Sequence, residues 1–192
     1  MKKLLVFFVT ILSCTQLVSN DISWSFPPQT LSTTGVNASD PHVVMDPSGN
    51  MVAVWVENGV VKANTKLLNA AWGTAASLSG SSASSPHVVV DSSGNANAVW
   101  NENGIIKASA KPFGGSWSSA VALSSSGASS PDLAVDAAGD VVAVWTRSGS
   151  VESSTKLFGA NWQNHVTITS SSAAFPRIAP RRCPGIQVPP YG

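Results

Sequence analysis

The sequence predicts an all-β fold built from repeated four-stranded antiparallel units. A block of 45 residues recurs three times in one phase, at residues 41–85, 86–130 and 131–175. Val, Ala, Ser and Gly dominate these blocks, and no long stretch after the amino terminus has helical periodicity. Strong turn signals separate the apolar runs inside each block. A sustained period of this length indicates a repeat architecture.

Four residue positions define the block: one aspartate, one glycine and two tryptophans. The aspartate and glycine share a turn, in which the carboxylate accepts main-chain N–H bonds and the glycine takes positive φ. The first tryptophan lies among valines, which predicts a core position, and the second opens the last strand after a loop. The positions are Asp46, Asp91 and Asp136; Gly49, Gly94 and Gly139; Trp55, Trp100 and Trp145; and Trp72, Trp117 and Trp162.

The first block predicts four strands. Residues 42–45 are a short apolar run suited to an inner strand, and residues 51–56 are apolar on both alternating faces, as expected of a strand covered from both sides. The third strand is expected over residues 60–67 and the fourth over residues 72–78. Residues 79–85, rich in Ser, Gly and Ala, are expected to link one block to the next.

The Asn58-Gly59 dipeptide predicts a two-residue hairpin and thereby a strand register. In that register Trp55 lies opposite Lys62, and Glu57 becomes a diagonal neighbour of Lys62, close enough for attraction. The second block repeats the pair as Glu102 and Lys107. The third has Arg147 and Glu152, so both charges invert and the predicted attraction remains.

Four short antiparallel strands in about 45 residues, apolar on both faces, are typical of a β-propeller blade that stacks on its neighbours. The predicted fold is a propeller-type array of three complete blades. Residues 21–40 supply a leading outer strand and linker, and residues 176–192 a truncated repeat start followed by an unrelated tail. A β-sandwich of successive hairpins is the alternative. Two copies that close a six-bladed ring are one solution to the incomplete blade number.

The repeat V-V-D-x-x-G-N, followed by A-V-W, N-G and a later Trp, resembles propeller-like repeats of exported, mostly uncharacterised bacterial proteins, loosely akin to the NHL and sialidase-like groups. The resemblance covers about residues 22–179 and implies architecture rather than activity. The sialidase Asp-box is not matched, because it places Asp two residues before Gly and Gly three before Trp. Here Asp91 precedes Gly94 by three residues and Gly94 precedes Trp100 by six.

The amino terminus predicts export. Residues 1–20 combine Lys2 and Lys3 with an apolar run over residues 4–12, which is too short to span a bilayer and is typical of a signal peptide. Cleavage after Ser19 would release a soluble protein. Alternatively, Ile11-Leu12-Ser13-Cys14 resembles a bacterial lipobox, in which Cys14 carries the lipid and provides the only membrane attachment. With 11 Lys plus Arg against 10 Asp plus Glu and no basic patch, the chain lacks the features of a nucleic-acid-binding protein.

The candidate ligand-binding residues are tryptophans and histidines. Trp72, Trp117 and Trp162 follow loops, where partial exposure would suit stacking on a glycan. His42 and His87 share one position at the start of the inner strand, where Asp132 and Arg177 stand in the later units. A ring of these side chains could bind a metal or polar ligand, although two histidines are an incomplete metal site. The turn aspartates are expected to be structural, since calcium needs several carboxylates and each loop has one.

We expect no enzymatic activity and no cofactor. There is no G-x-S-x-G motif and no recognisable Ser/His/Asp set, and the glutamates are better explained as hairpin charge partners than as catalytic acids. The sequence therefore favours an exported binding or interaction module whose partner is a protein or a glycan. A degenerate glycosidase-like propeller and a truncated remnant of a longer propeller protein are the alternatives.

Overall fold

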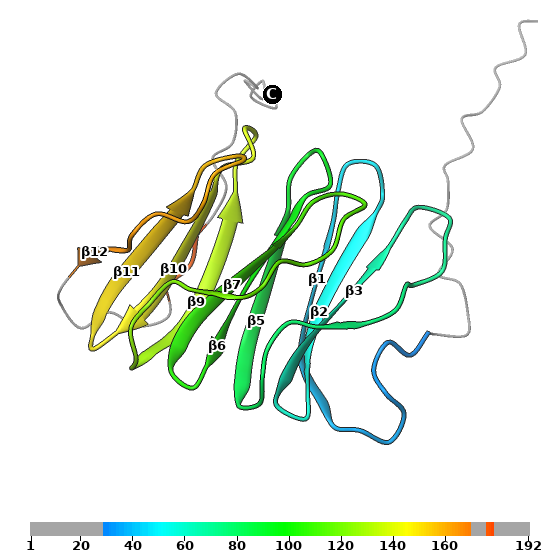
Figure 1. Ribbon diagram of the computed structural model, residues 1–192, viewed down its shortest axis with the longest axis horizontal. Helices are drawn as coiled ribbons and strands as arrows, with labels where there is room; N and C mark the ends of the chain where they lie inside the picture. Colours follow the sequence, from blue (N-terminus) through cyan, green and yellow to red (C-terminus); the bar gives the residue numbers. More distant parts are fainter. Residues whose placement is uncertain (1–28, 170–175, 179–192) are drawn as a thin grey trace, which may run out of the picture.

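The computed structural model describes residues 29–169 and 176–178, which form three four-stranded antiparallel sheets and no helix (Figure 1). Each sheet takes its strands in chain order, and we call the sheets blades 1, 2 and 3. Blade 1 contains β1 (Ala38–Met45), β2 (Met51–Glu57), β3 (Val60–Lys66) and β4 (Ala76–Ser77); blade 2 contains β5 (Ala83–Val90), β6 (Ala96–Glu102), β7 (Ile105–Lys111) and β8 (Val121–Ala122); blade 3 contains β9 (Ala128–Val135), β10 (Val141–Arg147), β11 (Ser150–Lys156) and β12 (Val166–Thr169).

The predicted hairpin register is confirmed. Glu57 pairs with Val60 and Trp55 with Lys62, and Asn58 and Gly59 have φ angles of 50° and 74°. Positive φ at both loop residues matches the right-handed twist of the two strands, and Asn-Gly supplies it at little steric cost. The third blade uses Ser148 and Gly149 at the same two positions.

Two predicted strand boundaries differ from the structure. The inner strands β1, β5 and β9 begin three residues before residues 41, 86 and 131, so they extend into segments expected to be linkers. A bulge between Ser39 and His42 absorbs the extra length. The fourth strand is shorter than predicted: β4 spans Ala76–Ser77, with one isolated pairing of Trp72 to Lys66. An outer-edge strand pairs on one side only, and Gly73 weakens its regular structure.

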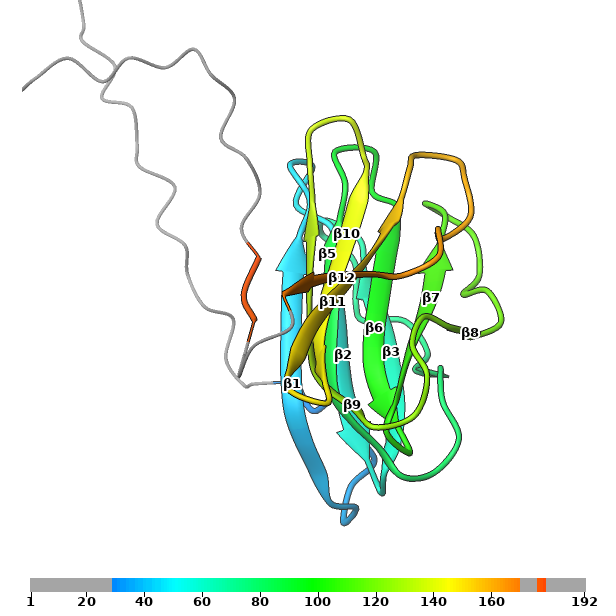
Figure 2. The ribbon, with the colours of Figure 1, turned by 90° about the vertical axis from the view of Figure 1, so that its left-hand side faces the viewer.

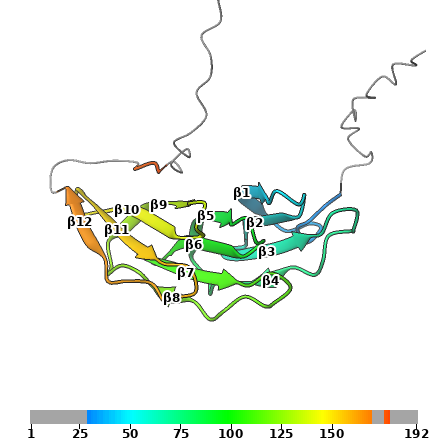
Figure 3. The ribbon, with the colours of Figure 1, turned by 90° about the horizontal axis from the view of Figure 1, so that it is seen from above.

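The blades stack side by side, with the inner strands β1, β5 and β9 along one edge of the array and the short outer strands β4 and β8 along the other (Figure 3). Contacts run from β5 to β1, β2 and β3, and from β9 to β5, β6 and β7. Figure 2 shows that the axes of the long strands in the three blades are roughly aligned with one another. Three separate sheets, rather than two facing ones, distinguish the fold from the β-sandwich alternative.

The core lies between the blades. Trp100 of blade 2 packs with Val56 and Val61 of blade 1, and Trp145 of blade 3 packs with Val99 and Ile106 of blade 2. We call the side of a blade that faces the preceding blade its leading face, and the opposite side its trailing face. Both faces of β6 are therefore buried, although Asn97, Asn101 and Glu102 interrupt its apolar residues. Blade 2 lies between blades 1 and 3, and the described residues form no closed ring.

Candidate functional site

Each mid-strand tryptophan donates its indole N–H to a buried carboxylate. Trp55 bonds to Glu57 at 3.2 Å, Trp100 to Glu102 at 3.0 Å and Trp145 to Glu152 at 2.9 Å. Trp100 and Trp145 are fully buried and Trp55 is 4% exposed. In blades 1 and 2 the carboxylate comes from the same strand, whereas in blade 3 it comes from the residue opposite in β11. In blade 3 the cation lies in β10 and the glutamate in β11, the reverse of blade 2, yet the indole N–H still bonds to a carboxylate.

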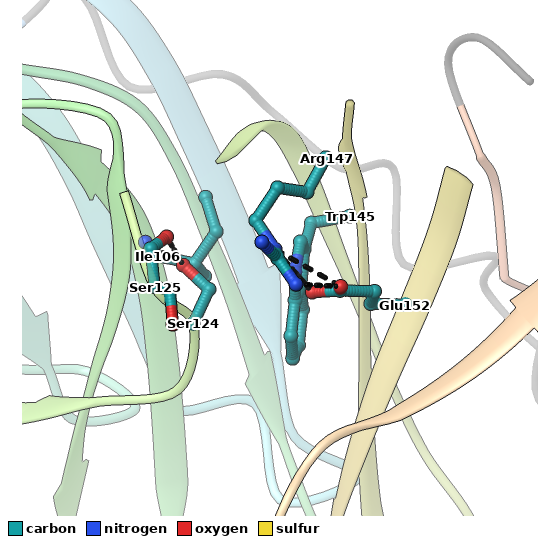
Figure 4. A network of polar contacts seen from close by, with 6 residues as sticks. All are labelled: Ile106, Ser124, Ser125, Trp145, Arg147 and Glu152. Carbon is teal, nitrogen blue, oxygen red and sulfur yellow. Dashed lines mark hydrogen bonds and ion pairs between the residues drawn. The ribbon is translucent and has the colours of Figure 1, made fainter. Parts of the chain in front are cut away.

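The predicted charge pairs form in two blades of the three. In blade 3 the Arg147 guanidinium donates three hydrogen bonds to Glu152, the shortest at 2.6 Å (Figure 4). In blade 2, Lys107 lies 3.0 Å from Glu102. In blade 1 Lys62 donates to Ser77 instead of to Glu57, and the predicted attraction remains only as a minor lowering of the Glu57 pKa by the Lys62 charge.

The freed Glu57 carboxylate accepts two bonds from Thr33, at 3.0 and 2.8 Å, so the segment that precedes β1 takes the place of the lysine. These bonds, from the main chain first and then the hydroxyl, lower the pKa of Glu57. Hydrogen bonds from Arg147 lower the pKa of Glu152 in the same way, although burial opposes them. Burial also opposes ionisation of Glu102, yet the bonds from Trp100 and Lys107 outweigh it and lower its pKa.

The turn aspartates Asp46 and Asp91 are 5% and 6% exposed, whereas Asp136 is exposed. All three accept bonds from their own turns, as shown by Asn95, which donates to Asp91 from its main chain and its side chain at 2.9 and 2.8 Å. Asp46 and Asp91 are more buried than Asp136 because the turn of the following blade lies against each of them. A Cβ built on Gly94 lies 3.2 Å from the Asp46 carboxylate, and one on Gly139 lies 3.4 Å from Asp91. Each turn thus covers the aspartate of the preceding blade.

Gly49, Gly94 and Gly139 all have positive φ, between 82° and 86°. The need for glycine is strictest at Gly94, because a Cβ atom there would also lie 2.6 Å from the Phe113 ring. Close approach of one turn to another, and not only the turn itself, therefore calls for glycine here.

The structure brings His42, His87 and Asp132 into one row across the inner strands. The two imidazole rings lie 5.0 Å apart, and His87 Nδ1 is 3.3 Å from an Asp132 carboxylate oxygen. Burial lowers the pKa of both histidines; His42 and Arg177 lower that of His87 further, and Asp132 opposes the shift in both. His42 Nδ1 is buried without a hydrogen-bond partner. In the described part of the chain, no group of three His, Cys, Asp or Glu side chains is placed to hold a metal ion.

The second set of tryptophans is half-buried in all three blades. Trp117 packs against the core between blades 1 and 2, and Trp162 packs in the same way against the core between blades 2 and 3. Trp72 and Trp162 also line cavities. The cavity at Trp162, which we call the outer groove, has a volume of about 640 Å³. It lies between blade 2, which contributes residues of β7 and β8, and the segment 161–165 of blade 3.

Polar groups surround Trp162 in the outer groove. Hydroxyl groups come from Ser109, Ser118 and Ser124, and amides and a cation from Asn161, Gln163, Asn164 and Lys156. Ser109 donates to the Ser118 carbonyl at 2.8 Å, and Ser124 accepts from the Ile106 main chain and donates to Ser125 (Figure 4). His165 closes one side, with its ring 6.2 Å from that of Trp145 in an edge arrangement. Sequence reasoning named Trp162 but missed the groove, because its two walls come from blades that only stacking brings together.

A second cavity, of about 550 Å³, lies on the leading face of blade 1 and is mostly apolar. Its lining includes Val43, Trp55, Trp72 and Leu31, the last from the segment that precedes β1. Residues 29–37 form no strand, so the leading outer strand predicted there is absent from the described part of that segment.

Comparison with known proteins adds no family assignment: no protein-family model matches the chain, and no curated protein is significantly similar to it. The repeated blade-like sheets therefore stand as a fold-level observation. The described residues contain no helix long and apolar enough to cross a membrane. Residues 1–20, with the predicted lipidation candidate Cys14, lie outside the described residues.

Proposed function

We propose that this protein is a non-catalytic binding module that takes a glycan into the outer groove. The observation that supports this proposal is the half-buried Trp162 indole, set within a groove of about 640 Å³ whose lining combines apolar side chains with hydroxyl, amide and ammonium groups. Small-molecule sites usually measure a few hundred cubic ångströms and combine an apolar surface with a few polar groups. A sugar ring has an apolar C–H face for the indole and hydroxyl groups at its rim for the polar walls.

The composition of the outer groove also favours binding over hydrolysis. Glycosidases use a pair of carboxyl groups on either side of the scissile bond. The groove has none among its lining residues; its ionisable groups are Lys156 and His165. The buried carboxylates Glu102 and Glu152 already accept bonds from tryptophan and from a cation, so they serve the core of the fold. This distribution argues against the glycosidase alternative.

A glycan array probed with the full chain, followed by calorimetric titration of the best ligand, tests the proposal. Trp162→Ala should weaken binding at least tenfold, about 1.4 kcal/mol, because it removes the stacking surface. Trp117→Ala is the matched control: it removes a half-buried tryptophan from the same repeat position, which packs against a core as Trp162 does but does not line the outer groove. Absence of glycan binding at millimolar concentration, or equal losses in the two variants, would count against the proposal.

We further propose that the module acts outside the cytoplasm, released after signal cleavage or held by a lipid on Cys14. The charged start and apolar run of residues 1–20 support export. Mass spectrometry of the processed amino terminus distinguishes the two routes. A chain that begins at Asn20 indicates release, a diacylated peptide that begins at Cys14 indicates anchoring, and an intact Met1 in the cytoplasm would refute export.

A further inference from the structure

Repeat positions that are buried between the blades are exposed at the two ends of the array. On the leading face, Val88 and Leu133 are 0% and 6% exposed, whereas Val43 at the same position in blade 1 is 60% exposed. On the trailing face, Leu123 is 6% exposed and Ile168 at the same position in blade 3 is 61% exposed. The internal interfaces thus show what covers each surface: the opposite face of another blade.

The two end faces are complementary because each repeats one half of an interface that the molecule already makes twice. Residues 30–33 of the chain itself cover only part of the leading face of blade 1, and Val43 stays exposed there. The trailing face of blade 3 has the residue positions that cover Val88 and Leu133, and the leading face of blade 1 has those that cover Leu123. We propose that the leading face of blade 1 binds the trailing face of blade 3 in a second copy of this chain. Such head-to-tail contacts form a closed ring when the rotation per blade permits. Two three-blade chains would give six blades, within the usual range of propellers.

The inner-strand row supplies polar side chains that would meet at this contact. Within one chain the row runs His42, His87, Asp132, with His87 3.3 Å from Asp132. A second copy stacked in the same phase places its own His42 next to Asp132, so the row continues with a histidine beside a carboxylate, as it does between blades 2 and 3.

Residues 176–178 of the same chain compete for this position. Pro176 is in phase with Pro131, and the main-chain N–H of Ile178 donates to Asp132 at 3.0 Å. In Figure 2 this segment, in orange, lies on the inner-strand side of the array. It therefore holds the place that β1 of a second copy would take on blade 3, and release of this segment should strengthen association.

Light scattering on a sizing column tests the proposal with the full chain, expressed with its own amino terminus. We expect a dimer that becomes monomeric in Val43→Lys and in Ile168→Lys. Mixing the two variants should restore a dimer, since one intact leading face and one intact trailing face remain between them. Leu67→Lys, at a residue 53% exposed in the turn after β3, is the matched control and should leave the dimer intact.

Ile178→Pro tests the competition, because proline cannot donate the hydrogen bond to Asp132, whereas Ile178→Val retains the donor. The proline variant should dimerise about tenfold more tightly, as expected for loss of a bond to a charged group in the competing state. A monomer at every concentration overturns the proposal. So does failure of mixing to restore the dimer, and so does a dimer that persists in one of the two lysine variants, since a two-fold contact between like faces is broken by only one of them. Unchanged folding of the variants, checked by circular dichroism, keeps both outcomes interpretable. The test is independent of glycan binding.

Discussion

Glu152→Ala should destabilise the protein more than any other single carboxylate substitution in the blades. The Glu152 side chain is 2% exposed and accepts three bonds from Arg147 and one from Trp145. Its removal leaves the guanidinium without a partner and the buried indole N–H without an acceptor. The Arg147 side chain is 30% exposed and can turn to water, so the main cost is the buried indole N–H left unsatisfied, about 1–3 kcal/mol. A domain is usually stable by about 5–15 kcal/mol, so this loss is a large part of the total.

Urea unfolding followed by tryptophan fluorescence and circular dichroism measures the effect. Glu152→Gln keeps one carbonyl acceptor for the indole and should lose less than the alanine variant. Glu102→Ala is the comparison within the chain, because Glu102 accepts a single bond from Lys107 at the equivalent hairpin, and its loss should be smaller. If Glu152→Ala costs less than about 1 kcal/mol, the Arg147–Glu152–Trp145 network does not hold blade 3 in the way inferred.

Three further perturbations test the contacts between blades. Gly94→Ala should cost about 1–3 kcal/mol more than Gly114→Ala in urea unfolding, because both residues have positive φ but only Gly94 is closely packed. Asp91→Ala should cost about 1–3 kcal/mol and Asp136→Ala under about 1 kcal/mol, since a following turn buries only the former. The pKa of His87 is lowered in the folded chain, so its contribution to stability is present above about pH 6.5 and lost as the pH falls through the folded value. Unfolding midpoints should therefore fall between pH 7 and pH 5, and less steeply in His87→Gln; a parallel decline in both proteins would refute this.

The sequence predicts best those features that depend on one blade alone. The Asn58-Gly59 turn determines a register that the structure confirms residue by residue, and the apolar run of residues 51–56 locates β2. Features that depend on two blades were missed. Nothing in the local sequence distinguishes Asp136 from Asp91, nor shows that Trp162 lines a groove while Trp117 does not.

Glu57 and Lys62 do not bond to each other, although the equivalent residues Glu102 and Lys107 of blade 2 do. Glu57 and Lys62 lie at positions equivalent to those of Glu102 and Lys107, and the register between their strands is the same. Their partners differ because Thr33, from the segment before β1, donates two hydrogen bonds to Glu57. Equivalence of positions predicts geometry, but the identity of a hydrogen-bond partner depends on which segment lies alongside.

The exposed fraction of side chains at equivalent repeat positions shows which blade faces have no neighbouring blade. Val43, Val88 and Leu133 have the same strand context, so the difference between 60% exposure in blade 1 and at most 6% in blades 2 and 3 reports the presence of a preceding blade. At 20–33 cal/mol per Å² of apolar surface, and with side chains of this size worth about 1.5–3 kcal/mol each on burial, two such uncovered residues are a substantial driving force for association. The repeat that stabilises the middle blade thus leaves the end blades with complementary surfaces, and the complementation between Val43→Lys and Ile168→Lys asks directly whether they meet.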